Sequence, residues 1–203
     1  MVIHEAGAVK ALNAAYKKGY EIAPMKDGRI GIYTEYWALE IPMRDLPLKV
    51  SQTLVEHLGH IPVAPEFCQK GRANQMMMES EVTDRRETLD MEKAEARNMR
   101  PIPLRFKGRW QLFVSAEGAI SGYDEEYLGV MDLEKCSPAY IMLENGNAEF
   151  SEPGCRMVIS AGCFGHEDRK RLWQIAKLYE TVGLGASEPA ENLSLFDDME
   201  REE

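Results

Sequence analysis

Cysteine and histidine are the residue types in this chain that could bind a metal ion. The candidate zinc ligands form two groups, namely His57, His60 and Cys68, and Cys155, Cys163 and His166. A structural zinc site usually contains two close ligand pairs, most often Cys-x₂-Cys, and the sequence contains no such pair. The two groups also lie far apart along the chain. We therefore predict no metal, no cofactor and no cysteine nucleophile, and we expect the four cysteines to be free thiols.

Acidic residues could take part in metal-dependent hydrolysis. Asp124-Glu125-Glu126 is expected in a loop between strands, and Asp132-Leu133-Glu134-Lys135 shares residue types with nuclease motifs. Those motifs place the lysine two positions after a carboxylate, so that both side chains point to one side of a strand. Here Lys135 follows Glu134 directly. The sequence also contains no glycine-rich phosphate loop and no nucleophile elbow. We predict no catalytic residue and favour a non-enzymatic protein, with an enzyme of an unrecognised family as an alternative.

A short basic segment could bind nucleic acid. Its candidate contact residues are Arg97, Arg100, Arg105, Lys107, Arg109 and Trp110. No acidic residue interrupts them, and basic side chains beside aromatic rings are typical of proteins that bind single strands. The alternative is an ordinary loop that leads into a sheet, with Trp110 packed inside. The run Arg169-Lys170-Arg171 could join this segment in space.

The C-terminal segment is strongly acidic and contains one apolar cluster. From Ser187 onward there are seven acidic residues and one arginine, so this segment carries −6 of the chain's net charge of −10. The apolar cluster is Leu193-Ser194-Leu195-Phe196. Leucine and phenylalanine in a solvated tail need a second surface to bury their apolar area. The pattern predicts a flexible acidic tail at 184–203 that carries a docking peptide.

The residues Asn192, Leu193, Ser194, Leu195 and Phe196 resemble the pentapeptide by which bacterial replication and repair proteins bind the β sliding clamp, usually Gln-Leu-(Ser/Asp)-Leu-Phe. The resemblance implies that both leucines and Phe196 are the anchors and that Asn192 and Ser194 make polar contacts. Asn192 stands where the usual motif has glutamine, which is one methylene longer. The alternative is a short terminal helix in which Leu193 and Phe196 pack on the protein's own surface.

The resemblance implies a non-enzymatic accessory protein of DNA replication or repair, from a bacterium, phage or mobile element, that is tethered to the β sliding clamp. Phosphates repel a chain this acidic as a whole, so any contact with DNA would need a local basic patch. A second hypothesis is an acidic DNA mimic that inhibits a host nuclease, although more than half of the net negative charge lies in the tail. The sequence has no apolar run of bilayer length and no signal segment, which predicts a cytoplasmic protein without membrane contact.

Hydrophobic periodicity predicts an α+β fold with hairpin-rich antiparallel sheets and about four helices. Helices are expected at 5–18, 46–58 and 167–182. Strands are expected at 20–23, 30–33, 36–41, 110–114, 119–123, 140–143, 148–150 and 157–159, with hairpin turns at Asp27-Gly28 and Asn145-Gly146. The predicted parts are an N-terminal α+β lobe (1–68), a charged helix or linker (69–100), a β-rich lobe with a terminal helix (101–183) and the acidic tail (184–203).

Overall fold

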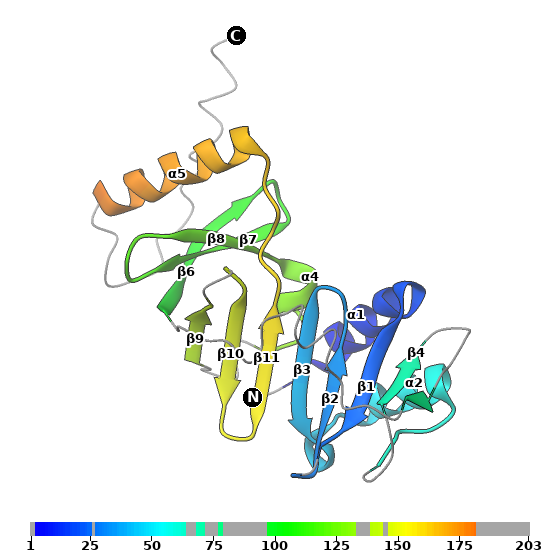
Figure 1. The fold of residues 1–203 in the computed structure, drawn as a ribbon. Coiled ribbons are helices and arrows are strands. Elements are labelled where there is room, and N and C mark those ends of the chain that lie inside the picture. Colours follow the sequence, from blue (N-terminus) through cyan, green and yellow to red (C-terminus); the bar gives the residue numbers. More distant parts are fainter. Residues whose placement is uncertain are drawn as a thin grey trace.

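The computed structural model describes residues 3–25, 27–63, 68–71, 77–78, 97–132, 139–143 and 146–181, and all structural statements below refer to these. It confirms the predicted α+β class, with antiparallel strands and four α-helices in the described ranges (Figure 1). The predicted acidic tail lies outside the described residues. No helix in the described ranges has the length and apolar character that crossing a membrane requires.

The elements follow one another as short helices and hairpins. The helices are α1 (Glu5–Lys18), α2 (Leu48–Leu58), α4 (Glu125–Leu128) and α5 (His166–Thr181), with a 3₁₀ helix η1 (Met43–Asp45). The strands are β1 (Tyr20–Pro24), β2 (Arg29–Tyr33), β3 (Trp37–Pro42), β4 (Cys68–Gly71), β5 (Met77–Met78), β6 (Arg97–Phe106), β7 (Trp110–Ser115), β8 (Ile120–Asp124), β9 (Ala139–Met142), β10 (Ala148–Glu152) and β11 (Cys155–Ile159).

The strands form one hydrogen-bonded sheet in the order β5-β4-β1-β2-β3-β11-β10-β9-β6-β7-β8. Neighbouring strands are antiparallel throughout. β3 pairs with β11, so the sheet runs without interruption from the N-terminal part of the chain into the C-terminal part. The division into lobes stays a prediction, since a continuous sheet can hold one folding unit or two.

α1 and α2 cover one face of the sheet, and alternate residues of the strands point toward them. The buried core on this side includes Ile22, Ile30, Ile32, Trp37, Leu39, Ile41, Phe150 and Met157. The helices contribute Leu12 from α1 and Leu54 from α2, both almost fully buried. Each aliphatic side chain of this size stabilises the fold by about 1.5–3 kcal/mol when it is fully buried.

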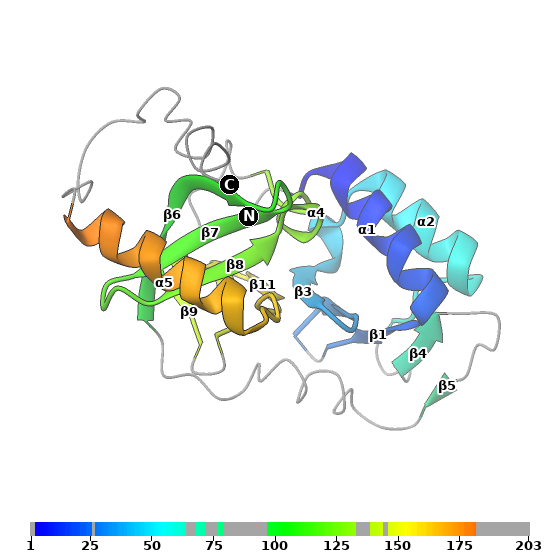
Figure 2. The ribbon, with the colours of Figure 1, turned by 90° about the horizontal axis from the view of Figure 1, so that it is seen from above.

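A second, smaller core lies at the other end of the sheet, where α5 crosses β6, β7 and β8 (Figure 2). Its buried members are Ile102, Phe106, Leu112, Val114 and Leu172. Leu172, Ile175 and Tyr179 of α5 belong to this core, and their spacing places them on one side of the helix. The other side of α5 therefore faces solvent.

Most predicted elements lie close to their predicted positions, and α2 begins later than expected. The sequence pattern places the helix start at Leu46, whereas the structure has η1 at Met43–Asp45 and the first α-helical residue at Leu48. Pro47 precedes the helix in an extended conformation (φ −59°, ψ 146°). A proline disfavours helical geometry in the residue before it, which explains why Leu46 cannot be the first turn of α2.

The structure describes only three short pieces of the predicted charged helix or linker at 69–100, so that assignment stays a prediction. β4 includes 69–71, β5 covers 77–78 and β6 begins at Arg97, so all three pieces are strands. Pro101 and Pro103 argue against a strand in the sequence, because proline cannot donate a ladder hydrogen bond. β6 tolerates them because it pairs with β9 only at Arg97 and Asn98, and because its register with β7 shifts between Pro101 and Arg105. Residues 72–76 and 79–96 lie outside the described residues.

Candidate functional site

The basic segment predicted to contact nucleic acid is β6 together with its turn into β7, and its charges are paired within the protein. Arg97 lies 3.1 Å from Glu117, and Lys107 lies 2.7 Å from Asp168 of α5. Arg105 forms an ion pair with Glu125, and Arg109 forms one with Asp124. The four basic side chains remain about half exposed or more, so the pairs of Arg97, Arg105 and Lys107 with partly exposed carboxylates contribute little to stability, typically about 0–1 kcal/mol each. Their positive charge is nevertheless offset locally by four carboxylates.

Asp124 shows that the predicted acidic loop at 124–126 is wrong. Asp124 ends β8 and is 2% exposed, while Glu125 and Glu126 form the first turn of α4. The Asp124 carboxylate accepts the backbone N–H of Glu126 at 3.0 Å and the Arg109 Nε–H at 2.6 Å. The bond from Glu126 caps the start of α4. The bond from Arg109 raises the pKa of the Arg109 guanidinium. The arrangement fixes the start of β7 against α4, and it explains Arg109 as a structural residue.

The aromatic residues of the basic segment pack inside the second core. The Trp110 ring meets Phe164 edge-on with centroids 5.3 Å apart, and the Phe106 ring meets Phe164 at 5.6 Å. Phe106 is buried and Trp110 is partly buried. The packed alternative for Trp110 is confirmed, although the segment around it is a hairpin of β6 and β7 rather than a loop. The Arg109 guanidinium also lies over the Trp110 ring, 5.4 Å from its centre.

α5 brings the second basic run beside the first. The Arg100 guanidinium lies 5.4 Å from the centre of the Tyr179 ring, and Lys107 pairs with Asp168 at the other end of the helix. Arg169-Lys170-Arg171 follows Asp168 directly, so the second basic run begins next to the α5 residue that pairs with Lys107, and a shared site of the two runs stays a prediction.

The predicted clamp-binding residues 192–196 lie outside the described residues. Among the described residues, no three His, Cys, Asp or Glu side chains are placed to hold a metal ion. Cys163 is exposed, and burial raises the pKa of the Cys155 thiol to about 11. Cys155 is therefore protonated at neutral pH and is a poor nucleophile.

No protein family, curated protein or solved structure matches this chain. The assignment of a site therefore depends on the residues and their geometry.

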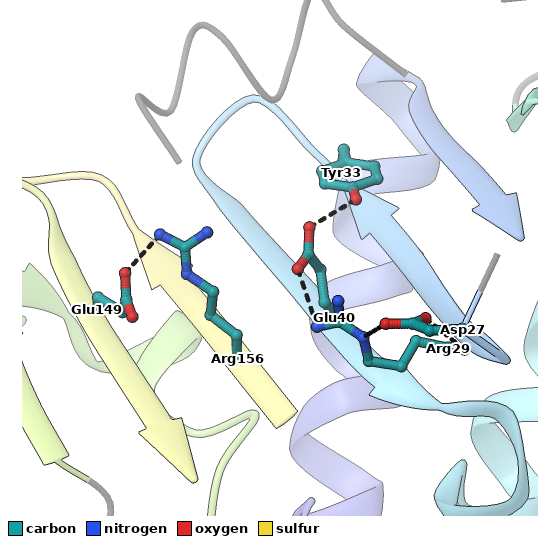
Figure 3. Close-up of polar contacts among 6 residues, drawn as sticks. All are labelled: Asp27, Arg29, Tyr33, Glu40, Glu149 and Arg156. Carbon is teal, nitrogen blue, oxygen red and sulfur yellow. Dashed lines mark hydrogen bonds and ion pairs between the residues drawn. The ribbon is translucent and has the colours of Figure 1, made fainter. Parts of the chain in front are cut away.

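A buried polar cluster lies on the face of the sheet opposite α1 and α2 (Figure 3). Glu40 of β3 is 1% exposed, and its carboxylate accepts the Tyr33 hydroxyl at 2.9 Å and an Arg29 N–H at 3.3 Å. Arg29 also donates to Asp27 at 2.7 Å, in the turn that precedes β2. Gly31 lies directly across from Glu40, and a β-carbon there would be 2.4 Å from the Tyr33 hydroxyl. The missing side chain at Gly31 gives Tyr33 the space to reach Glu40.

The polar cluster continues onto the neighbouring strands. Arg156 of β11 is the direct neighbour of Glu40 across the strand pair, and its guanidinium donates to Glu149 of β10 at 2.5 Å. Glu21 of β1 is also buried and is paired in register with Tyr33. Charges buried in this way are stable only with hydrogen-bonded partners of opposite sign. We interpret the cluster as a feature that fixes the strand register. A slip of one residue would point these charged side chains toward the apolar core on the other face of the sheet.

A histidine network explains one of the zinc candidates. The Tyr20 hydroxyl lies 3.1 Å from His57 Nδ1, and His57 Nε2 lies 3.0 Å from the Asn13 amide oxygen. The Asn13 oxygen can only accept, so Nε2 carries the proton and the neutral Nδ1 accepts from Tyr20. Tyr16 stacks on the imidazole ring at 4.1 Å. His57 therefore joins α1, α2 and β1 as a neutral side chain.

Protonation of His57 is expected to destabilise the fold. Burial lowers the pKa of His57 below its ordinary value of 6.5, so the unfolded chain binds the proton more readily than the folded chain. The contribution of His57 to the free energy of unfolding is fully present above pH 6.5, and it is lost as the pH falls through the lower pKa of the folded state. We expect the free energy of unfolding lost in His57→Gln, measured by urea titration, to be larger at pH 7.5 than at pH 5.5. His60→Gln, at an exposed histidine, is the control, and an equal loss for His57→Gln at both pH values would contradict the prediction.

A small cavity lies where the end of α1 meets the β2–β3 turn and α4. It has a volume of about 70 Å³ and is lined by Lys18, Glu35, Tyr36 and Tyr127, among others. The rings of Tyr36 and Tyr127 stack at 5.9 Å, and the Lys18 ammonium donates to Glu35 and to the Tyr36 hydroxyl, at 3.2 Å each. Small-molecule sites usually have volumes of about 300–1,000 Å³, so this cavity fits a few water molecules rather than a substrate.

Proposed function

We propose that this chain is a non-enzymatic accessory protein of DNA replication or repair, from a bacterium, phage or mobile element, that binds the β sliding clamp. The observation that carries the proposal is the pentapeptide at residues 192–196, within a segment of net charge −6. α5 ends at Thr181, and the sequence between it and the pentapeptide is rich in Gly, Ala, Ser and Glu. Such a composition suits a connector between a folded body and a docking peptide. The protein acts in the cytoplasm, where the clamp is loaded on DNA.

The expected affinity follows from the apolar anchors. Burial of Leu195 and Phe196 contributes about 1.5–3 kcal/mol each. Micromolar binding corresponds to a free energy of about −8 kcal/mol, so Leu193 and the hydrogen bonds of the peptide must supply the remainder and offset the cost of ordering the peptide. Binding of this strength allows several proteins to share one clamp by exchange.

The DNA-mimic hypothesis gains no support from the described surface. Such an inhibitor needs carboxylates that are free to imitate phosphates, whereas Glu117, Asp124, Glu125 and Asp168 are paired with basic side chains. The enzyme alternative requires a pocket with convergent polar groups, and no specific observation on the described residues favours one.

Loss of the anchors should remove clamp binding. The test is a titration of purified bacterial β clamp with the full-length protein and with Leu195→Ala/Phe196→Ala, followed by surface plasmon resonance or calorimetry. We expect micromolar binding for the natural sequence and a weakening of about 100-fold or more for the double variant. Asp198→Ala/Met199→Ala, just beyond the pentapeptide, is the matched control and should bind normally. No binding of the natural sequence at about 100 μM would contradict the proposal.

Restoration of the usual glutamine should strengthen clamp binding. Asn192 is one methylene shorter than the glutamine of the usual motif, so its amide hydrogen bonds reach less far. We expect Asn192→Gln to bind about three- to tenfold more tightly, the equivalent of one improved hydrogen bond of about 1 kcal/mol. Asn192→Ala should bind more weakly than the natural sequence. An identical affinity for all three forms would show that position 192 does not contact the clamp.

A further inference from the structure

The outer side of α5 differs from the rest of the described basic surface. Its inner side is formed by Leu172, Ile175 and Tyr179, which belong to the second core. Lys170, Trp173 and Lys177 follow one another at spacings of three and four residues on the opposite side. All three are exposed, and Trp173 has an exposed fraction of 58%. A tryptophan this exposed is unusual for a surface without a partner.

Trp173 is held in a defined orientation by its neighbour on the helix. The Lys177 ammonium lies 3.9 Å from the centre of the Trp173 ring, within the range of a cation–π contact. This contact occupies one face of the ring and brings a positive charge beside it. The high exposure of Trp173 leaves indole surface open to solvent. A planar partner that carries a negative charge would match both properties at once.

The charges on this side of α5 are less neutralised than those of β6. Lys170 and Arg171 have no carboxylate partner among the described residues. Asp168 is engaged by Lys107, and the Arg169 Nε–H donates to the Phe164 carbonyl at 2.8 Å. Glu167, in the first turn of α5, is exposed. Four basic side chains of β6 and its turn into β7, in contrast, face carboxylates, namely Arg97, Arg105, Lys107 and Arg109.

We propose that the outer face of α5, formed by Lys170, Trp173 and Lys177, binds single-stranded nucleic acid. Trp173 stacks on a base, and the two lysines contact the backbone phosphates on either side of it. An unpaired base exposes the flat surface that stacking needs, whereas the bases of a duplex are stacked on one another, so the face selects single strands.

The proposed site is separate from the proposed clamp peptide. It depends on residues 170–177 of α5 and needs no contact by residues 192–196. A protein with both sites would hold a single strand close to a clamp. Since the net charge is −10, the interaction should be weak at physiological salt and strong only at low ionic strength.

The test is fluorescence anisotropy of a labelled 20-nucleotide oligothymidylate with the full-length protein, without clamp, at low salt. We expect saturable binding that falls as salt rises. Trp173→Ala and Lys170→Ala/Lys177→Ala should each weaken it by about tenfold or more, and Trp173→Phe should retain most of it. Lys17→Ala removes an exposed lysine from α1, and Leu178→Ala removes an exposed side chain from α5; both controls should bind as the natural sequence does.

Three results would overturn the proposal. The first is no binding at 100 μM protein, on the order of the weakest nonspecific affinities. The second is equal affinity for a duplex of the same length. The third is the absence of oligonucleotide binding together with binding of a synthetic 187–203 peptide that Lys170→Ala/Lys177→Ala abolishes. That result would show that this face binds an acidic peptide instead. Leu195→Ala/Phe196→Ala should bind the oligonucleotide normally, so failure of the clamp proposal and failure of this one are distinguishable.

Discussion

Glu40→Ala is expected to reduce the free energy of unfolding by about 3 kcal/mol, because it removes one member of a buried, hydrogen-bonded charge cluster. The Tyr33 hydroxyl and the Arg29 guanidinium both donate to the Glu40 carboxylate, and Glu40 is 1% exposed. The variant leaves these two donors without that acceptor inside the protein. Arg29 keeps its contact with Asp27, which limits the loss. The measurement is a urea titration of the natural sequence and the variant.

Two control variants separate the effect of burial at Glu40 from the effect of its charge on the free energy of unfolding. Glu35→Ala removes a carboxylate of the same kind from an exposed ion pair with Lys18, and we expect it to cost at most about 1 kcal/mol. Glu40→Gln keeps the shape and one acceptor oxygen, so its effect should lie between the two. If Glu40→Ala and Glu35→Ala destabilise the protein equally, the cluster does not contribute to stability in the way described.

Gly7→Ala is expected to destabilise the protein by about 2–3 kcal/mol, although alanine is the better helix former by up to about 1 kcal/mol. A β-carbon at Gly7 would lie 1.8 Å from the Gly129 carbonyl oxygen and 2.6 Å from its carbonyl carbon. Both atoms belong to the backbone and cannot rotate away. α1 would have to move from the turn after α4, where His4 N–H donates to the Val130 carbonyl at 2.9 Å.

The sign of the Gly7 effect is the decisive result. In a helix without close neighbours, replacing glycine by alanine would stabilise the protein. A lower urea midpoint for Gly7→Ala than for the natural sequence therefore indicates the steric contact with Gly129. Ala6→Gly, at the exposed preceding position, measures the effect of helix propensity alone and should cost no more than about 1 kcal/mol. A variant Gly7→Ala that is as stable as the natural sequence, or more stable, would show that α1 and α4 are not in contact.

Local signals in the sequence account for much of the fold. α1 has its predicted bounds because Glu5 lies at its start, Lys17 and Lys18 lie in its last turn, and Gly19 ends it. The Asp27-Gly28 dipeptide marks the hairpin between β1 and β2, where the Asp27 carboxylate accepts the Arg29 N–H. These features depend on residues within a few positions of one another, which a sequence pattern can show.

The site residues were harder to predict because their partners are distant in the sequence. The basic run of β6 contains no acid, yet Glu117, Glu125 and Asp168 reach it from a turn and two helices. Glu40 alternates with Leu39 and Ile41, a pattern that normally indicates an exposed polar face. Its carboxylate is buried by Tyr33 and Arg29, which donate to it from β2, and its neighbour Arg156 comes from β11. Trp173 could have been found in the sequence, since it is the aromatic residue opposite the Leu172–Ile175–Tyr179 side of the helix.

The pairing of β3 with β11 has a consequence for how the chain folds. Trp37 is in register with Ile159, and more than half of the chain separates them. During synthesis the edge of β3 has no partner until β11 has left the ribosome, so its backbone N–H and C=O groups can pair with other chains. Contacts of such high sequence separation close late and slow the folding reaction. Nascent N-terminal segments of this protein should therefore be substrates for chaperones that shield strand edges.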